Sequence, residues 1–354
     1  MKHFILILVL AASFNAYAQK PAVTRFYQLT GNIDKYPVTF LLHRINEDFT
    51  GTYYYHSSGT PMDIAGKLEK DGSLKLIYLA NDEANNEIIQ GSFKDSVFSG
   101  TWQSNGKMLT MRVAQPKEAP PIGFDYIWTH GARKITNKEQ HLQHIDEYNY
   151  DGRAVWPVAG STHPATKVIQ QTIRESLGGK NTSDEPGKIL LAHKNQYMNP
   201  QTEDDSLFYE ISEAVDIVYA DNRLLVLANS SFSYTGGAHG NYGTSYDNVD
   251  LQRGRKLTLN DVMDSSAASK TVEKLLAKEF VRKFPLDEDQ KLRDVLLVEK
   301  IELTQNFMLT GKGIAFNYTP YEIAAYAYGQ IVLFIPYKVI AAYLKPEFKK
   351  LMGL

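Results

Sequence analysis

The sequence contains no cysteine among its 354 residues. Structural disulfides are therefore excluded, and so is a lipid anchor attached through a cysteine at a signal-peptide cleavage site. The stability of the fold has to come from hydrophobic cores, and the chain is long enough for two domains of typical size.

Long hydrophobic runs are also scarce. The apolar run at residues 4–14 follows Lys2 and precedes the small-x-small sequence Ala16-Tyr17-Ala18. This run is well short of the roughly twenty residues that a membrane-spanning helix needs, and its charged and small flanks are typical of a cleavable signal peptide. We therefore expect residues 1–18 to be removed before Gln19. The mature chain is expected to be soluble and exported, either periplasmic or secreted, without membrane insertion and not as a lipoprotein.

An excess of basic residues is absent as well, because the formal net charge is −2. A nucleic-acid partner is not expected, since such proteins carry a basic surface. Tyrosine is abundant, with 22 residues. Tyrosine is common both in β-sheets and on recognition surfaces, so this count alone does not separate a structural role from a binding role.

The first third of the chain has short apolar runs separated by turn residues. Asp71-Gly72 and Asn105-Gly106 each stand between two such runs, which is the strongest local signal for a β-hairpin. The expected strands are Thr24–Thr30, Val38–Ile45, Gly51–His56, Met62–Glu69, Ser73–Leu79, Glu87–Lys94, Val97–Gln103 and Met108–Val113. Residues 19–115 are therefore predicted to form a small antiparallel β-barrel or sandwich.

A proline-rich segment follows at residues 116–121. Proline cannot donate to a sheet and favours extended backbone, so we expect a linker here and a second domain at residues 122–354.

The second region alternates helices and strands, which indicates an α+β domain with an antiparallel sheet covered by helices. One helix is predicted from apolar residues spaced four apart, namely Ala165, Ile169, Ile173 and Leu177. Ser161–Pro164 is expected to cap this helix, with Pro164 in its first turn, and Gly178-Gly179 to end it. The other expected elements are strands at Phe208–Ala220, Leu224–Thr235, Tyr242–Leu251, Phe307–Leu309, Ile314–Tyr318 and Gln330–Ile335, and helices from near Ser265 and at Tyr337–Leu344.

Two pairs of motifs in this region resemble a known family. Tyr234–Gly240 (YTGGAHG) is followed by Arg255–Asp261 (RKLTLND), and Tyr321–Ala327 (YEIAAYA) is followed by Ile335-Pro336-Tyr337. Together with Trp156-Pro157-Val158, these motifs are similar to the extracellular domain of RsiV-type anti-sigma factors. That domain also precedes the catalytic domain of PdaC-type peptidoglycan deacetylases, and the resemblance covers roughly residues 122–354.

The resemblance implies a non-catalytic recognition domain of the cell envelope. In RsiV the domain binds lysozyme, and in the deacetylases it accompanies an enzyme that acts on peptidoglycan. The present chain shows neither a membrane helix with a sigma-binding segment nor a deacetylase domain, so those roles do not carry over. Ala325 stands where the family often has proline. The first region is similar to small β-barrel domains through Tyr36-Pro37-Val38 and Gly51–Tyr55, a likeness that names no activity.

The candidate binding residues lie in two segments of the second region. Tyr234–Gly243 contains four glycines, which permit close approach of another chain or ligand, and His239, which can act as a base, a ligand or a pH-sensitive contact. Tyr318–Tyr328 is rich in tyrosine and would serve either as an aromatic platform or as core filling. If the two segments lie side by side, they would form the recognition face. The candidate residues are Tyr234, Gly236, Gly237, His239, Tyr242, Tyr321, Tyr326 and Tyr328.

No catalytic residue, metal site or cofactor is predicted. His141 and His144 are three residues apart and lack the glutamate of a zincin motif, and there is no Gly-x-Ser-x-Gly sequence. The carboxylates Asp247, Asp261, Glu302 and Glu322 would serve a glycosidase only as a pair placed across a cleft.

The sequence thus predicts an exported, non-catalytic binding protein of the bacterial cell envelope. Its expected partner is a lysozyme-like hydrolase, or peptidoglycan or another glycan. Two alternatives stay open: a polysaccharide- or peptidoglycan-modifying hydrolase or deacetylase, and a carrier of a small apolar ligand inside the first domain, which requires an empty barrel.

Overall fold

The computed structural model describes residues 22–78, 85–116, 122–135, 145–179, 184–199 and 208–354. The expected signal peptide, the His141–His144 pair and residues 117–121 of the proline-rich segment lie outside the described residues.

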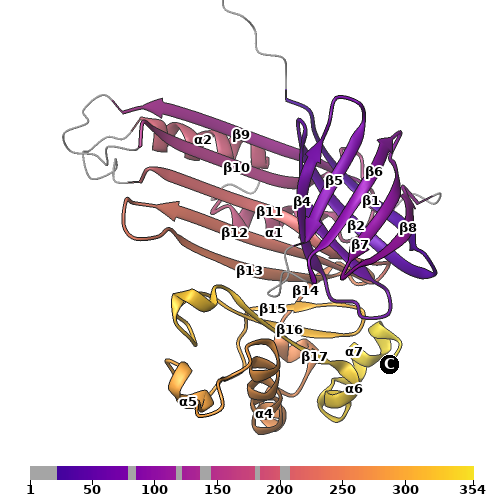
Figure 1. Cartoon of the computed structure of the whole chain (residues 1–354), viewed down its shortest axis with the longest axis vertical. Coiled ribbons are helices and arrows are strands. Elements are labelled where there is room, and N and C mark those ends of the chain that lie inside the picture. Colours follow the sequence, from indigo (N-terminus) through magenta and orange to yellow (C-terminus); the bar gives the residue numbers. More distant parts are fainter. Residues whose placement is uncertain (1–21, 79–84, 117–121, 136–144, 180–183, 200–207) are drawn as a thin grey trace, which may run out of the picture.

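Eight antiparallel strands close into a barrel at the start of the described chain (Figure 1). The barrel closes because β1 pairs with β2 on one side and with β8 on the other. A barrel, rather than a sandwich, is thus the form that this part of the chain adopts. Its strands are β1 Thr24–Ile33, β2 Tyr36–Ile45, β3 Asp48–Tyr55, β4 Met62–Leu68, β5 Ser73–Tyr78, β6 Glu87–Lys94, β7 Val97–Ser104 and β8 Lys107–Ala114.

Local turn chemistry fixes the hairpins of this barrel. Asn105 and Gly106 both have positive φ, at 48° and 71°, which is the backbone that a two-residue hairpin between twisted strands requires. The pairing of Ser104 with Lys107 places this turn directly between β7 and β8.

The barrel interior is filled by apolar side chains. Leu29, Phe40, Leu74 and Phe98 are 0% exposed, so no water-sized gap adjoins them. An apolar ligand held inside the barrel would have to displace this packing.

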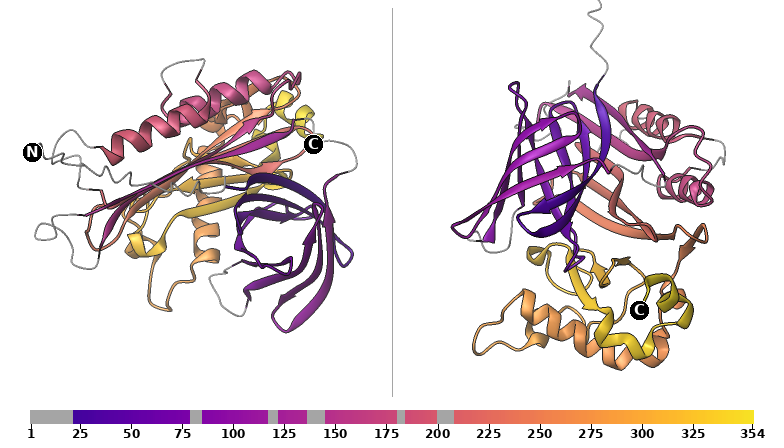
Figure 2. Two further views of the ribbon diagram at one scale, coloured as in Figure 1. Left: turned by 90° about the horizontal axis from the view of Figure 1, so that it is seen from above. Right: turned by 90° about the vertical axis from the view of Figure 1, so that its right-hand side faces the viewer.

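A six-stranded sheet follows, in the order β14-β13-β12-β11-β10-β9. Only the β10–β11 pair is parallel among these strands. Helices α1 and α2 cover one face of the sheet, and the barrel lies against the other (Figure 2). The bounds are β9 Phe124–Lys134, β10 Glu147–Pro157, α1 Thr166–Ser176, α2 Pro186–Met198, β11 Glu210–Ala220, β12 Leu224–Tyr234, β13 Asn241–Asp250 and β14 Arg255–Leu257.

The buried face predicted for α1 is confirmed, but its predicted cap is wrong. Ala165, Ile169 and Ile173 are 0% exposed. The helix begins at Thr166, after Ala165 as N-cap residue, and no side chain caps it. Pro164 therefore precedes the helix. The backbone N–H of Thr166 donates to the carbonyl of His163, which closes a turn around Pro164 just before the helix begins.

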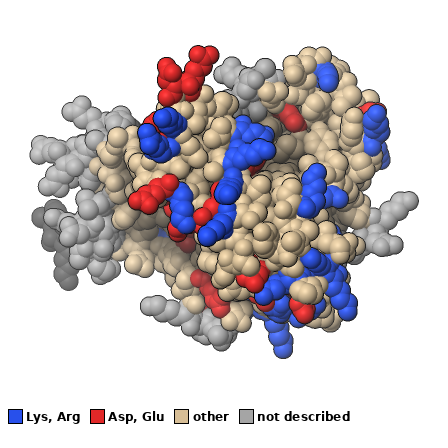
Figure 3. All heavy atoms as spheres, turned by 90° about the horizontal axis from the view of Figure 1, so that it is seen from below, with Lys and Arg blue, Asp and Glu red and all other residues tan. Residues whose placement is uncertain are grey.

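A smaller sheet, in the order β15-β16-β17, packs against α4 (Figure 1). Acidic and basic side chains are interspersed on the face of the molecule that Figure 3 shows. The elements of this part are α3 Leu259–Val262, α4 Ser265–Lys283, α5 Leu292–Val295, β15 Phe307–Leu309, β16 Gly313–Tyr318, the 3-10 turn η4 Tyr326–Tyr328, β17 Ile331–Pro336, α6 Tyr337–Ile340, the 3-10 turn η5 Ala341–Tyr343 and α7 Pro346–Met352.

The two helices expected here are found with changes. The start of α4 at Ser265 is as predicted, and Val272, Leu276 and Phe280 form its buried face. The single helix expected at 337–344 is wrong: a short α-turn passes into a 3-10 turn, and α7 begins separately at Pro346. Pro346 disfavours helical backbone at Lys345, so a continuous helix is interrupted at Lys345.

The barrel and the sheet share one hydrophobic core, which includes Leu41 and Tyr54 of the barrel. Two barrel hydroxyls also donate to carbonyls of β11: Thr52 to Val218 (2.8 Å) and Tyr54 to Ala220 (2.7 Å). These hydrogen bonds, of which the second is fully buried, help to fix the barrel on the sheet. None of the helices in the described ranges is long and apolar enough to cross a membrane.

Candidate functional site

The two candidate segments lie side by side and their rings contact each other. His239, from the β12–β13 loop, stacks on Tyr326 with ring centroids 3.6 Å apart and planes 17° apart. Tyr321 and Tyr242 complete the group, with centroids 5.6 Å and 5.7 Å from that of Tyr326. We call these four residues the His239 cluster.

Hydrogen bonds orient the rings of the cluster. The Tyr326 hydroxyl donates to the carbonyl of Gly240 (2.7 Å), and that same carbonyl lies 3.1 Å from His239 Nδ1. A carbonyl only accepts, so Nδ1 carries a proton, and Nε2 lies 3.3 Å from the Tyr321 hydroxyl. The histidine therefore links the loop to the tyrosine segment.

Tyr321 is the most exposed tyrosine of the cluster, at 54%. Its backbone has φ 69°, in the left-handed region that bulky residues rarely adopt. The turn around it is closed by Glu322, whose carboxylate accepts from the backbone N–H (2.8 Å) and hydroxyl (3.1 Å) of Thr319. A strained backbone that holds an aromatic ring in solvent is typical of functional sites.

The other candidate residues support the fold around the cluster. Tyr328 turns away from it and packs on Phe280 and Phe284. Tyr234 packs near Tyr209 and donates to the carbonyl of Gly237 (3.1 Å), within its own loop.

Of the two candidate glycine positions in this loop, only one requires glycine. Gly236 has φ 88°, where a side chain would be strained, whereas a Cβ at Gly237 would meet open space. The structure thus brings four of the eight candidates together, and the other four shape or support the surrounding chain.

The carboxylates considered for catalysis are engaged in local structure. Glu322 closes the turn before β17, and Glu302 lies 3.0 Å from the ammonium of Lys300. Asp247 pairs with Lys256 (2.7 Å), and Asp261 pairs with Arg255 (2.7 Å) and accepts from the backbone N–H of Thr258 at the start of α3. Within the described ranges, no group of three or more His, Asp or Glu side chains is placed to hold a metal ion.

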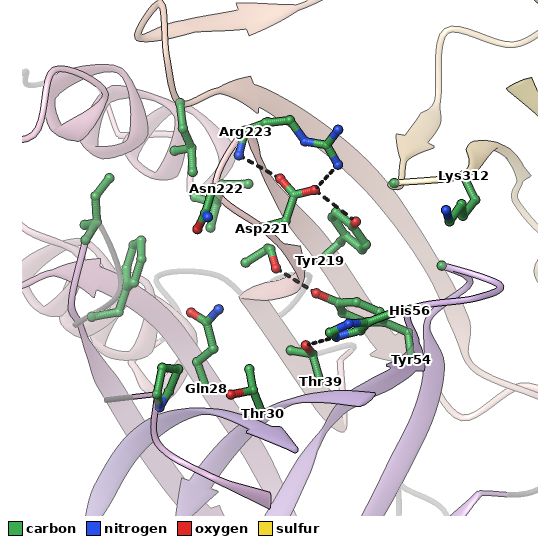
Figure 4. Close-up of a pocket in the computed structure, with 18 residues that line it drawn as sticks. Gln28, Thr30, Thr39, Tyr54, His56, Tyr219, Asp221, Asn222, Arg223 and Lys312 are labelled. Carbon is green, nitrogen blue, oxygen red and sulfur yellow. Dashed lines mark hydrogen bonds and ion pairs between the residues drawn. The ribbon is translucent and has the colours of Figure 1, made fainter. Parts of the chain in front are cut away.

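A second concave site lies where the barrel meets the sheet (Figure 4). This pocket has a volume of about 620 Å³, within the range of small-molecule sites. Its walls come from strands β1–β3 and the loop after β3, from the β11–β12 turn and from the β15–β16 turn, with Pro116, Ile122, Phe124 and Leu251 completing them. We call it the junction pocket. Sequence reasoning missed it because segments far apart in the chain build it.

An ion pair forms one wall of the junction pocket. The Asp221 carboxylate accepts from the guanidinium of Arg223 (2.8 Å) and from the backbone N–H groups of Arg223 (2.7 Å) and Leu224 (2.9 Å). Arg223 also donates to the carbonyl of Met352 in α7 (2.5 Å). The pair closes the β11–β12 turn, and its two charges offset each other.

The barrel forms the opposite wall. The Thr39 hydroxyl shares a 2.9 Å hydrogen bond with His56 Nε2, and Tyr54 stacks on Tyr219 with centroids 4.7 Å apart. Burial, and then the positive charge of Lys312, lower the pKa of His56, which keeps the imidazole neutral at neutral pH.

These observations define a mixed α+β protein in which a closed eight-stranded antiparallel barrel precedes an α+β region. Residues 260–338, from α3 to α6, match the family described as "Protein of unknown function (DUF3298)". This match lies in the second half of the chain. No curated protein matches the chain.

Two solved structures described as members of that family are similar to this chain. A DUF3298 family member from Bacteroides fragilis is 22% identical with a TM-score of 0.54, over 66% of this chain and 98% of that one. A DUF3298 family protein from Pseudomonas aeruginosa is 20% identical with a TM-score of 0.48, over 64% of this chain and 96% of that one. At this identity, the B. fragilis structure shows likeness of fold alone.

Proposed function

We propose that this chain is an exported, non-catalytic binding protein of the bacterial cell envelope that recognises its partner through the His239 cluster. The proposal includes the signal peptide at residues 1–18, the domains at 19–115 and 122–354 and the RsiV-like character of the second domain. The partner is a lysozyme-like hydrolase or peptidoglycan.

The observation that carries the proposal is the exposed ring of Tyr321, held beside His239 and Tyr326 on a strained backbone. Exposed aromatic rings with polar tips are enriched at the centres of binding interfaces. A structural role for Tyr321 would be served better by a buried ring, or by glycine at this φ.

Either partner can use such a surface. Sugar rings pack their C–H faces on exposed aromatic rings, and the Tyr321 hydroxyl and His239 supply hydrogen bonds beside them. A protein partner would instead pack an apolar side chain on the exposed ring of Tyr321, which makes Tyr321 an energetic centre of the interface.

The test is binding of residues 19–354 to lysozyme and to soluble peptidoglycan fragments, measured by calorimetry. His239→Ala and Tyr321→Ala are expected to weaken binding of the true partner about tenfold or more, because each removes a ring from the centre of the contact.

Tyr36→Ala is the matched control, since Tyr36 is an exposed tyrosine, 43% accessible, at the β1–β2 turn of the barrel. It should leave binding unchanged. Tight binding that survives both cluster substitutions would move the interface elsewhere. Failure to bind either target would remove both proposed partners.

A further inference from the structure

A groove with an apolar floor lies between α4 and the chain around α5, in the part of the molecule away from the barrel (Figure 1). Ala277, Leu292 and Leu296 form the floor together with the buried Ile301. The groove has a volume of about 360 Å³, within the range of small-molecule sites. We call it the α4 groove. Both of its walls belong to residues 208–354, all of which the structure describes.

The groove stays open because its far wall is attached to another part of the chain. Leu296 forms a β-bridge with Ala324, and the backbone N–H of Leu297 donates to the carbonyl of Ile323 (2.9 Å). On the α4 side, Ala277 contributes only a methyl group. The two walls therefore do not fill the space between them.

The charged side chains of the α4 wall are unevenly paired. Glu273 accepts from the hydroxyl of Ser269 (2.6 Å) and from the ammonium of Lys300 (3.1 Å), and these hydrogen bonds lower its pKa. Lys270 and Lys274 lie one turn apart on the same helix, and neither belongs to an ion pair within the described ranges. The α4 wall therefore has two ammonium groups available to an anion, while its carboxylate already has partners.

The opposite wall carries charges of both signs. Arg293 pairs with Asp294 (3.6 Å), and Lys300 pairs with Glu302 (3.0 Å) as well as with α4. Glu299 is exposed, and no ion pair of the described chain involves it, so it repels an anion on its own side. An anionic group is therefore favoured beside α4.

The shape of the groove suits a chain rather than a ring. Its α4 wall runs from Lys270 to Ala277, which is about 10 Å along the helix axis. A ligand with its anionic head at the two lysines would lay its tail over Ala277 and onto Leu292 and Leu296. A polar ring would leave this apolar floor in water, and a wholly apolar ligand would leave the lysines without a partner.

We propose that the α4 groove binds a single-chain fatty acid of medium length, with its carboxylate at Lys270 and Lys274 and its alkyl chain on the apolar floor. This site is separate from the His239 cluster and does not rest on the function proposed for that cluster.

The test is calorimetric titration of residues 19–354 with decanoate, kept below the concentration at which it forms micelles. Butyrate has the same head and a shorter chain, and decyltrimethylammonium has the same chain and a positive head. Decanoate is expected to bind about tenfold more tightly than either one. Compared with butyrate it removes more apolar surface from water, and compared with the cation it gains charge-assisted hydrogen bonds to lysine.

Substitutions in the groove separate the two contributions. Ala277→Leu fills the space over the floor and should weaken decanoate about tenfold. Lys274→Gln should remove most of the preference for decanoate over the cation. Lys278→Gln is the matched control, because Lys278 is an exposed lysine of α4 outside the groove, and it should change neither affinity. Thermal midpoints of all variants verify folding.

The proposal is overturned if decanoate does not bind at about 1 mM, or if butyrate or the cation binds as tightly. It is also overturned if Ala277→Leu or Lys274→Gln binds decanoate as the native protein does. Binding to phosphatidylglycerol vesicles without binding of free decanoate would equally contradict it, because the groove would then be a membrane contact.

Discussion

Tyr321 is bulky, exposed and positioned at positive φ. Left-handed backbone costs a residue with a Cβ about 1–2 kcal/mol relative to the right-handed form, and glycine avoids most of this cost. The strain at this position can therefore be measured separately from the role of the ring.

Comparison of Tyr321→Gly with Tyr321→Ala makes that separation. Both lack the ring, but only alanine keeps the Cβ strain, so the glycine variant should be more stable to unfolding by about 1 kcal/mol. Urea denaturation measures this difference. Equal stabilities would mean that the turn does not hold φ near 69° in solution.

At the scale of elements, α2 is attached to the sheet by a hydrogen bond that depends on protonation. His193 Nδ1 lies 2.8 Å from the carboxylate of Glu213 in β11, which also accepts from the hydroxyl of Tyr150 in β10 (2.5 Å). The hydrogen bond to Glu213 raises the pKa of His193, against the opposing effect of burial.

A raised pKa means that the folded state holds this proton more tightly than the unfolded state. The resulting stabilisation is fully present below the ordinary histidine pKa of about 6.5 and is lost as pH rises through the folded value. The opening free energy of α2 amides, measured by hydrogen exchange, should therefore fall between pH 5.5 and 8.

His193→Gln should abolish this pH dependence because glutamine does not titrate. The amides of α1 serve as an internal reference, since that helix lacks such a contact within the described chain. An identical pH dependence in the native protein and the variant would assign the effect to another group.

The elements that sequence reasoning found are those with local signals. Asn105-Gly106 marks its hairpin without help from distant residues, and Ala165 and Ile169 display the inner face of α1. Helix α2 was missed because Ile189, Leu190 and Leu191 are consecutive and conceal the helical period: the first two are buried, and Leu191 is 46% exposed. Strand β9 was missed because its sequence, FDYIWTHGARK, alternates only weakly.

The candidate site was predictable only in part for the same reason. The His239 loop and the Tyr321 segment are each unusual in sequence, but their contact depends on how β13 and β16 are brought together. Asn306 and Asn317 make this connection, because both donate to the carbonyl of Thr244 in β13. The junction pocket depends on tertiary packing throughout. Nothing near Lys312 in the sequence indicates Gly59 or Asp221 as its neighbours.

At the scale of the whole molecule, His43 lies buried between the barrel and the sheet, 2% exposed. Its Nε2 accepts from the backbone N–H of Ile217 (3.3 Å). Protonation of Nε2 would therefore place two N–H donors against each other. Burial lowers the pKa of His43, Asp216 raises it and Arg153 lowers it, with burial the largest effect. Tyr126, which also packs on the imidazole, has a raised pKa and stays neutral.

The lowered pKa of His43 predicts acid destabilisation of the entire fold. The unfolded chain binds a proton at His43 below about pH 6.5, whereas the folded chain does not, so the thermal midpoint should fall as pH drops below that value. His43→Gln should flatten this decline, because its amide can still accept from Ile217. His163→Gln, outside the barrel–sheet contact, should decline as the native protein does.

The order of the strands has a consequence for how the chain reaches its final form. Every barrel strand pairs with the next one along the chain, and only the β1–β8 seam joins distant residues, whereas the parallel β10–β11 pair must wait for the connecting helices. Local pairing is fast, and N-terminal units form first during synthesis. The barrel can therefore be complete before the last two thirds of the chain exist, and it then offers Thr52 and Tyr54 as a ready-made template on which β11 settles.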